Sequence, residues 1–143
     1  MGLSRRSAFV ATLSAGLLSV LAPPSAKAGS NDPLFVNLTS DDGHRVDMAL
    51  TFGAMQLKRG HPLTVFMNDR AVFAASKTNA AKFRDQQKAM ASLLDAGATI
   101  IACPMCMKHF GVAESDLLPG LKVGNPDTTG AALFAENTKT LSW

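Results

Sequence analysis

Residues 98–112, ATIIACPMCMKHFGV, contain both cysteines of the chain and determine how we interpret the rest of it. Residues 98–102 form a short apolar run rich in β-branched side chains, which is typical of a buried strand. Pro104 is well tolerated in the first turn of a helix, and Gly111 is a typical helix C-cap. We therefore predict that Cys103 lies between a strand and a helix, at the sheet edge where open α/β folds gather their chemistry.

The rest of the chain alternates between strand and helix patterns. The second predicted strand is apolar almost throughout, as expected when both faces of a sheet are covered. The pattern predicts a three-layer α/β/α sandwich with a mostly parallel five-stranded sheet. The predicted strands are 34–38, 62–67, 98–102, 121–123 and 140–143, and the predicted helices cover about 46–57, 80–95, 104–110 and 126–136.

The first 28 residues have the features of an export signal. Arg5 and Arg6 form a basic region, residues 8–22 are apolar but short for a membrane span, and residues 26–28 (AKA) resemble a cleavage site. We expect a signal peptide at 1–28, of the twin-arginine or the ordinary secretory type, and a single domain at 29–143. The mature protein would then be periplasmic, with no stable membrane span after cleavage; an uncleaved anchor is the competing interpretation.

Charge and motifs give no support for a nucleic-acid partner or a bound cofactor. The chain has 14 Lys and Arg against 11 Asp and Glu, and its pI is about 9.1. Without Arg5, Arg6 and Lys27, 11 basic residues face 11 acidic ones, so the basic pI comes from the leader. Neither a G-x-x-x-x-G-K nor a G-x-G-x-x-G motif is present, and we expect no cofactor and no nucleic acid.

The spacing of Cys103 and Cys106 predicts chemistry rather than a structural staple. A C-x-x-C bridge closes a very small loop and constrains the unfolded chain little. A helix amino terminus lowers a thiol pKa, so we expect Cys103 to be the nucleophile, accessible and faced by backbone amides. Cys106 lies one helical turn later and is predicted to be the resolving thiol. Two buried thiols or an inert bridge are the alternative in which the pair has no chemical role.

Two further functions use the same segment. Cys103, Met105, Cys106 and His109 are soft or imidazole ligands that suit Cu(I), although Met105 and Met107 point apart on a helix. A thioredoxin-like dithiol oxidoreductase also fits a C-x-x-C pair. However, such chains place the pair after an early strand, whereas here it follows the third. The alternatives to a sulfur-transfer function are therefore a copper-binding, a redox or a purely scaffolding function.

Five residues near two other predicted strand ends also have predicted roles. Asp69 and Arg70 follow the strand predicted at 62–67 and are expected to line a pocket beside Cys103, because their loop leaves the same sheet edge. Asp41 and Asp42, with His44 just after them, are predicted to cap the first helix, since acidic residues there complement its dipole.

Three short segments in order resemble one known family. The strand followed by CPMC and then by Gly111-Val112, the segment FMNDRAV at 66–72, and LLPGLKVG at 117–124 are similar to motifs of the DsrE/DsrF-like family of sulfur-relay proteins. The resemblance covers about 34–143. It implies a compact five-stranded α/β domain, often a homotrimer or homohexamer, that carries sulfur as a persulfide and exchanges it with a protein donor or acceptor.

Residue by residue, Cys103 matches the sulfur-bearing cysteine of that family, and Cys106 matches a second cysteine that only some members have. The resemblance thus implies a sulfur carrier that acts on a protein partner rather than an enzyme that turns over alone. The chain departs from the pattern in its leader, because the best-known relatives work in the cytosol. Because of that departure, the resemblance does not extend to their particular pathways and partners.

Overall fold

The computed structural model describes residues 31–143, so the export signal predicted at 1–28 lies outside the described residues. Within 31–143 the strands are β1 (Leu34–Leu38), β2 (Leu63–Met67), β3 (Thr99–Ala102), β4 (Lys122–Val123) and β5 (Lys139–Ser142). The α-helices there are α1 (Gly43–Lys58), α2 (Ala80–Asp95), α3 (Pro104–Phe110) and α4 (Pro126–Leu133). The 3₁₀ helices are η1 (Asp69–Phe73), η2 (Lys77–Asn79) and η3 (Glu114–Asp116). None of the helices in this part of the chain is long and apolar enough to cross a membrane.

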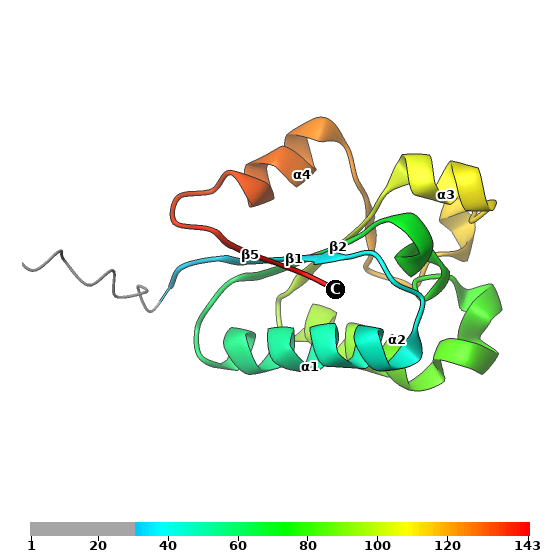
Figure 1. The fold of residues 1–143 in the computed structure, drawn as a ribbon, viewed down its shortest axis with the longest axis horizontal. Helices are drawn as coiled ribbons and strands as arrows, with labels where there is room; N and C mark the ends of the chain where they lie inside the picture. The colour runs from blue at the N-terminus through cyan, green and yellow to red at the C-terminus, as the bar shows by residue number, and fades with distance from the viewer. Residues whose placement is uncertain (1–30) are drawn as a thin grey trace, which may run out of the picture.

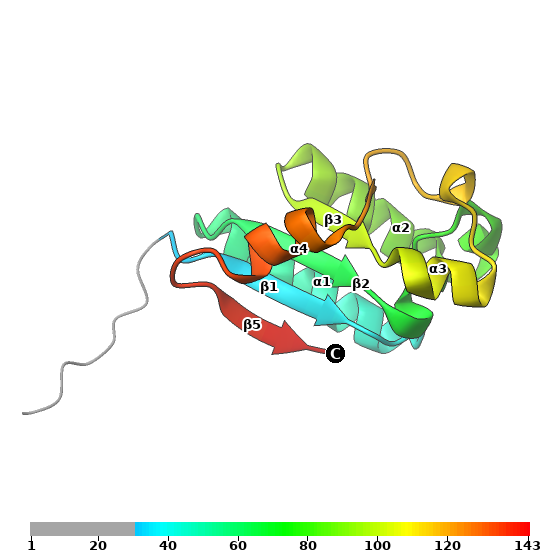
Figure 2. The ribbon, with the colours of Figure 1, turned by 90° about the horizontal axis from the view of Figure 1, so that it is seen from above.

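The strands form one sheet in the order β4-β3-β2-β1-β5, and every neighbouring pair is parallel. Figure 1 shows α1 and α2 on one side of the sheet and α3 and α4 on the other. Seen from above, the carboxyl ends of β2 and β3 point toward α3 (Figure 2). The predicted three-layer α/β/α sandwich is confirmed, with a sheet that is parallel throughout rather than mostly parallel.

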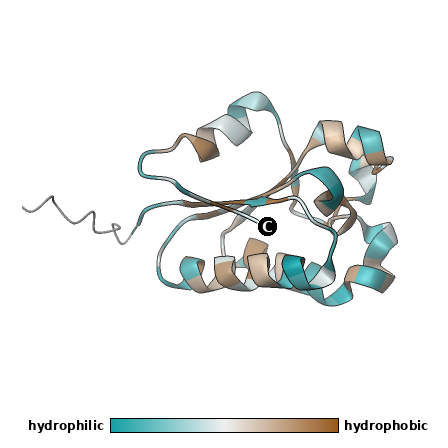
Figure 3. Cartoon of the chain, in the orientation of Figure 1, coloured by the Kyte–Doolittle hydropathy of each residue, from teal (hydrophilic) through white to brown (hydrophobic). Residues whose placement is uncertain are grey.

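The core lies between the sheet and the layer of α1 and α2. Alternate residues of the central strands face this layer, as the period of two in a strand requires. Hydrophobic residues concentrate in the strands and alternate with polar ones along α1 (Figure 3). The central part of the core consists of Val36, Leu38, Val65, Met67 and Ile100 from the strands and Val46, Leu50, Phe83 and Met90 from the helices.

The helix starts follow the sequence more closely than the helix ends. The Asp42 carboxylate accepts a hydrogen bond from the Arg45 N–H at 2.9 Å, so Asp42 caps α1 as predicted. Helix α4 was expected to reach about residue 136 but ends at Leu133. The reason is a tight reversal: Asn137 has a φ of 60°, and the chain must turn there to enter β5 at Lys139.

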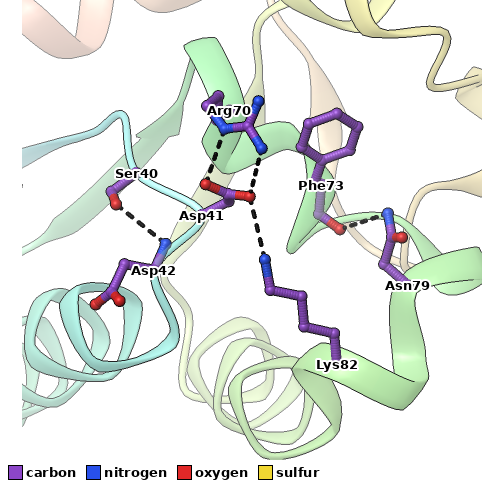
Figure 4. Close-up of polar contacts among 7 residues, drawn as sticks. All are labelled: Ser40, Asp41, Asp42, Arg70, Phe73, Asn79 and Lys82. Atoms are coloured by element: carbon purple, nitrogen blue, oxygen red, sulfur yellow. Dashed lines mark hydrogen bonds and ion pairs between the residues drawn. The ribbon is translucent and has the colours of Figure 1, made fainter.

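Asp41 does not cap α1 but joins three segments that lie apart in the sequence. Its carboxylate accepts two hydrogen bonds from the Arg70 guanidinium, both at 2.9 Å, and one from Lys82 Nζ at 3.1 Å (Figure 4). These contacts tie the loop after β1 to η1 and α2. Chiefly because Arg70 hydrogen-bonds the ionised form, the pKa of Asp41 is lowered from 3.8 to about 2.

Gly124 ends β4 where the chain passes close to β3. Its N–H donates to the Ala102 carbonyl at 2.8 Å. A Cβ at this position would lie 2.8 Å from a methyl of Ile101, 3.0 Å from Thr129 Oγ1 and 3.3 Å from the Ala102 carbonyl oxygen. The close approach of the Gly124 backbone to the side chains of Ile101 and Thr129 and to the Ala102 carbonyl explains a glycine here.

We predict that Gly124→Ala lowers the free energy of unfolding by about 1–3 kcal/mol, because the added methyl overpacks this contact. Gly130 is the matched control, since it lies within α4 and a Cβ there would meet no atom within 4 Å. Gly130→Ala is expected to raise stability by roughly 0.5–1 kcal/mol through helix propensity. Urea unfolding followed by circular dichroism measures both; equal effects of the two substitutions would contradict the packing argument.

We also predict that Asp41→Asn lowers stability at neutral pH by about 1 kcal/mol or less, since both cationic partners are half exposed. The folded-state pKa of about 2 lies below the ordinary 3.8, so this stabilisation is present above roughly pH 4 and is lost as the pH falls toward 2. Thermal unfolding from pH 7 to pH 2 should show the wild type and Asp41→Asn converging at the acid end. The exposed Asp85→Asn serves as the control, and a gap of constant size across the range would refute the linkage.

Candidate functional site

The join between β3 and α3 has the geometry that the sequence predicts. Cys103 is the N-cap of α3, with φ −73° and ψ 115°, and Pro104 is the first helical residue. Gly111 closes the helix in the left-handed region at φ 71°, where glycine is the favoured residue. The Cys103 N–H donates to the Met67 carbonyl at 2.9 Å, so residue 103 continues the ladder between β2 and β3. Cys103 therefore sits at the carboxyl edge of the sheet.

The two thiols contact each other and form no disulfide. The Cys106 thiol donates to Cys103 Sγ at 2.9 Å, and the Cys106 N–H points to the same sulfur at 3.4 Å. The expectation that backbone amides face Cys103 is met by this one amide. Cys103 Sγ is thus the acceptor at the end of two hydrogen bonds.

The expectation of an accessible Cys103 is not met. The residue is only 7% exposed, whereas Cys106 is partly exposed. Because Cys103 still hydrogen-bonds within the sheet ladder, its side chain begins inside the layered structure and not on an open loop.

Cys106 contacts Asp69, which the sequence predicts only as a residue that lines a pocket beside Cys103. The Asp69 N–H donates to Cys106 Sγ at 3.0 Å. Burial is the main cause that raises the pKa of the Cys106 thiol, and the hydrogen bond to Cys103 adds to it. The Asp69 N–H acts in the opposite direction, and the charges of Cys103 and of the Asp69 carboxylate raise the pKa further. In the resting state Cys106 keeps its proton and donates it toward Cys103.

Asp69 and Arg70 leave the same sheet edge as Cys103, as predicted, but only Asp69 contacts a thiol. The contact comes from its backbone and not from its carboxylate. Arg70 turns toward Asp41, and its guanidinium carbon lies 5.4 Å from the centre of the Phe73 ring and 6.0 Å from that of Phe110. An Asn-Asp pair directly after a strand is the sequence signal for such a turn, because both residues tolerate left-handed backbone.

The side chains of the copper alternative have different surroundings. Met105 is 78% exposed, whereas Met107 belongs to the hydrophobic core. The His109 ring packs edge-on against Phe110, with the ring centres 4.7 Å apart. Among residues 31–143, no cluster of three or more His, Cys, Asp or Glu side chains is placed to hold a metal ion. The described structure therefore brings together Cys103 and Cys106 from that set.

Solved structures share this fold at low sequence identity. MTH1491 from Methanobacterium thermoautotrophicum has a TM-score of 0.67 and 15% identity, over 79% of this chain and 100% of that chain. BT1422 from Bacteroides thetaiotaomicron has a TM-score of 0.61 and 24% identity, over 78% and 95%. The ychN protein from E. coli has a TM-score of 0.61 and 14% identity, over 79% and 99%.

No curated protein matches the sequence of this chain. The cysteine segment and its two flanking motifs resemble one family, and the sequence as a whole matches that same family. The model of the DsrE/DsrF-like family matches residues 33–137, which is most of the chain, and the protein therefore belongs to this family.

Proposed function

We propose that this protein is an exported sulfur carrier that holds sulfane sulfur as a persulfide on Cys103, with Cys106 as the resolving thiol. The observation that carries the proposal is the pair of hydrogen bonds that end on Cys103 Sγ, one from the Cys106 thiol and one from its amide. Donors directed at a sulfur atom stabilise negative charge on it, and the thiolate is the reactive form. Membership of a family associated with sulfur relay supports the same assignment.

Loading and delivery need no net oxidation. The Cys103 thiolate attacks the outer sulfur of a donor persulfide, a new S–S bond forms at Cys103, and the donor leaves as a thiolate. In delivery, a thiolate of the acceptor protein attacks the outer sulfur on Cys103, and Cys103 leaves as a thiolate. Both half-reactions are transfers between thiolates, so the protein functions as a carrier between protein partners and needs no cofactor.

The resolving step releases sulfur when no acceptor takes it. The Cys106 thiolate attacks the inner sulfur of the Cys103 persulfide, and the outer sulfur leaves with the bonding electrons as hydrosulfide. The two cysteines become oxidised to a disulfide, and a protein dithiol must reduce them before the next cycle. Only local movement is needed, since Cys103 directly follows β3 and Cys106 lies in the first turn of α3.

The periplasm is the proposed location, on the basis of residues 1–28. Their basic region, short apolar stretch and small-residue site are those of an export signal. An oxidising envelope favours thiol pairs that cycle between dithiol and disulfide. The export proposal rests on the sequence alone, because these residues lie outside the described part of the structure.

A thiol–disulfide oxidoreductase is the second candidate, favoured by the 2.9 Å between the two sulfur atoms. Cys106 would then be the exposed thiol that meets the substrate disulfide, and the carrier role of Cys103 would be absent. The Cu(I) module, with Cys103, Met105, Cys106 and His109 as ligands, is the third. Of that set, Cys103 and Cys106 contact each other in the structure of residues 31–143.

We further propose that the protein forms a homo-oligomer, as its family resemblance implies. Two exposed features support this. Among residues 31–143, strand β5 ends the sheet order and pairs only with β1, which leaves an open edge in this part of the chain. Met48, Phe52 and Met55 on α1 and Leu141 on β5 are exposed large apolar side chains, and the Phe52 ring centre lies 5.9 Å from that of Trp143, which follows β5. Surfaces of this kind mark contacts between proteins.

For the carrier, we predict that reduced wild-type protein treated with polysulfide gains one sulfur atom on Cys103. Cys106→Ser should retain this adduct for longer, because the resolving attack is removed, whereas Cys103→Ser should not form it. Intact-mass spectrometry followed by peptide mapping measures all three proteins. Sulfur uptake on Cys106 alone, or on neither cysteine, would contradict the assignment of Cys103 as the sulfur-carrying residue.

An insulin-reduction assay with dithiothreitol distinguishes the second candidate. A carrier is expected to be no faster than the buffer control, whereas an oxidoreductase accelerates precipitation in a manner that Cys106→Ser abolishes. Anaerobic Cu(I) titration of the same wild-type sample separates the metal module from both.

For the homo-oligomer, we predict that Met55→Glu shifts the protein toward monomer, because it introduces a charge into the apolar surface on α1. Met105→Glu is the matched control: Met105 is also exposed, but it lies on α3. Sedimentation velocity of the wild type and both variants measures the effect. A wild type that is monomeric at high concentration, or an equal loss in both variants, would argue against this surface.

A further inference from the structure

The turn between β2 and η1 has an unusual backbone that the carrier chemistry above does not explain. Asp69 has a φ of 47°, in the left-handed region that few residues other than glycine adopt. Asparagine and aspartate are the commonest exceptions, but the conformation still has a cost that its surroundings must offset. This backbone conformation directs the Asp69 N–H at Cys106 Sγ, at 3.0 Å.

The turn is held in place by contacts that do not involve the cysteines. The Asn68 N–H donates to the Leu38 carbonyl at 2.9 Å, and the Asn68 carbonyl accepts from the Ala71 N–H at 3.1 Å. The Asn68 side-chain amide also donates to the side-chain oxygen of Asn37, in the middle of the sheet. The Asp69 N–H is therefore held in place by contacts to β1 and within η1 that do not involve α3.

Cys106 needs such a donor for its own reaction. In the resting pair it is the protonated partner, and burial opposes its ionisation. To attack sulfur carried on Cys103, it must first lose its proton to solvent. A backbone N–H can donate but cannot accept, so at 3.0 Å it favours the charged form of the sulfur over the neutral one.

We infer that the Asn68–Asp69 turn is a built-in donor that stabilises the Cys106 thiolate and so enables sulfur release from Cys103. The inference rests on the proposed function and adds a group that acts on the release step alone. In that step the bond between the Cys103 sulfur and the outer sulfur breaks, and a bond between Cys103 Sγ and Cys106 Sγ forms. The outer sulfur departs as hydrosulfide, and a protein dithiol later reduces the disulfide.

Two substitutions at Asp69 separate the backbone from the side chain. Both Asp69→Gly and Asp69→Val remove the carboxylate, whose charge opposes ionisation of Cys106. Glycine keeps the left-handed turn and its N–H, whereas a β-branched residue is strongly disfavoured there. The two variants are therefore expected to shift the pKa of the Cys106 thiol in opposite directions.

The test measures the rate of alkylation of Cys106 by iodoacetamide against pH, in a Cys103→Ser background that carries no sulfur. Relative to that parent, Asp69→Val should move the midpoint upward by about one pH unit, which is roughly a tenfold lower rate at neutral pH. Asp69→Gly should move it slightly downward, and Asp85→Asn should leave it in place. Equal midpoints in the Gly and Val variants, or shifts in the same direction, would overturn the inference.

Hydrogen exchange at the residue 69 amide provides a second measurement if the valine variant does not fold. Cys106→Ser keeps an acceptor for this N–H and Cys106→Ala removes it, so exchange should be several-fold faster in the alanine variant. Equal exchange would overturn the contact itself. Neither readout involves sulfur uptake, so failure of the carrier proposal, seen as no adduct on Cys103, is distinguishable from failure of this one.

Discussion

The register between β2 and β3 is the constraint on which the candidate site depends. Met67 pairs with Ala102, and the Cys103 N–H donates to the Met67 carbonyl at 2.9 Å. The segments that leave these two strands therefore start at the same level of the sheet. A slip by one residue would turn every buried side chain of a strand to the other face, so the core itself fixes this register. Helix α3 consequently begins beside the turn at Asn68.

The same register gives the two thiols different surroundings, although only two residues separate them. Cys103 belongs to the end of a sheet ladder and is almost covered, and Cys106 belongs to a helical turn and is partly exposed. One sulfur accepts hydrogen bonds from its neighbour, and the other donates its proton and accepts from Asp69. This asymmetry suits the two separate roles that we propose for a pair of identical side chains, one holding sulfur and one releasing it.

The charged cluster around Asp41 supports the site from outside it. Arg70 follows Asp69 in η1, and its ion pair with Asp41 ties that helix to the loop after β1, while Lys82 ties the same carboxylate to α2 (Figure 4). Arg70 also lies over the ring of Phe110 in α3. Arg70, which the sequence was expected to place in a pocket beside Cys103, instead ties η1 to the loop after β1 and packs against α3.

The sequence by itself determined the α/β class, the strand-to-helix join at Cys103, the cap at Asp42 and the pairing of Cys103 with Cys106. These features depend on local patterns: an apolar run, a proline in the first helical turn, an acidic residue before a helix and a fixed spacing. It also indicated the family. Each of the three short motifs is unspecific by itself, but the three in this order are specific. The end of α4 was misplaced, since a reversal at Asn137 depends on where β5 must begin.

The tertiary structure alone decided how far Cys103 is covered, which thiol donates to the other, and where Arg70 turns. It also decided that the contribution of Asp69 is its backbone N–H and not its carboxylate. Each of these facts depends on residues brought together from β1, β2 and α3, which are separated by tens of residues in the chain. Burial and hydrogen-bond direction arise from such packing, whereas spacing and periodicity are properties of the chain itself.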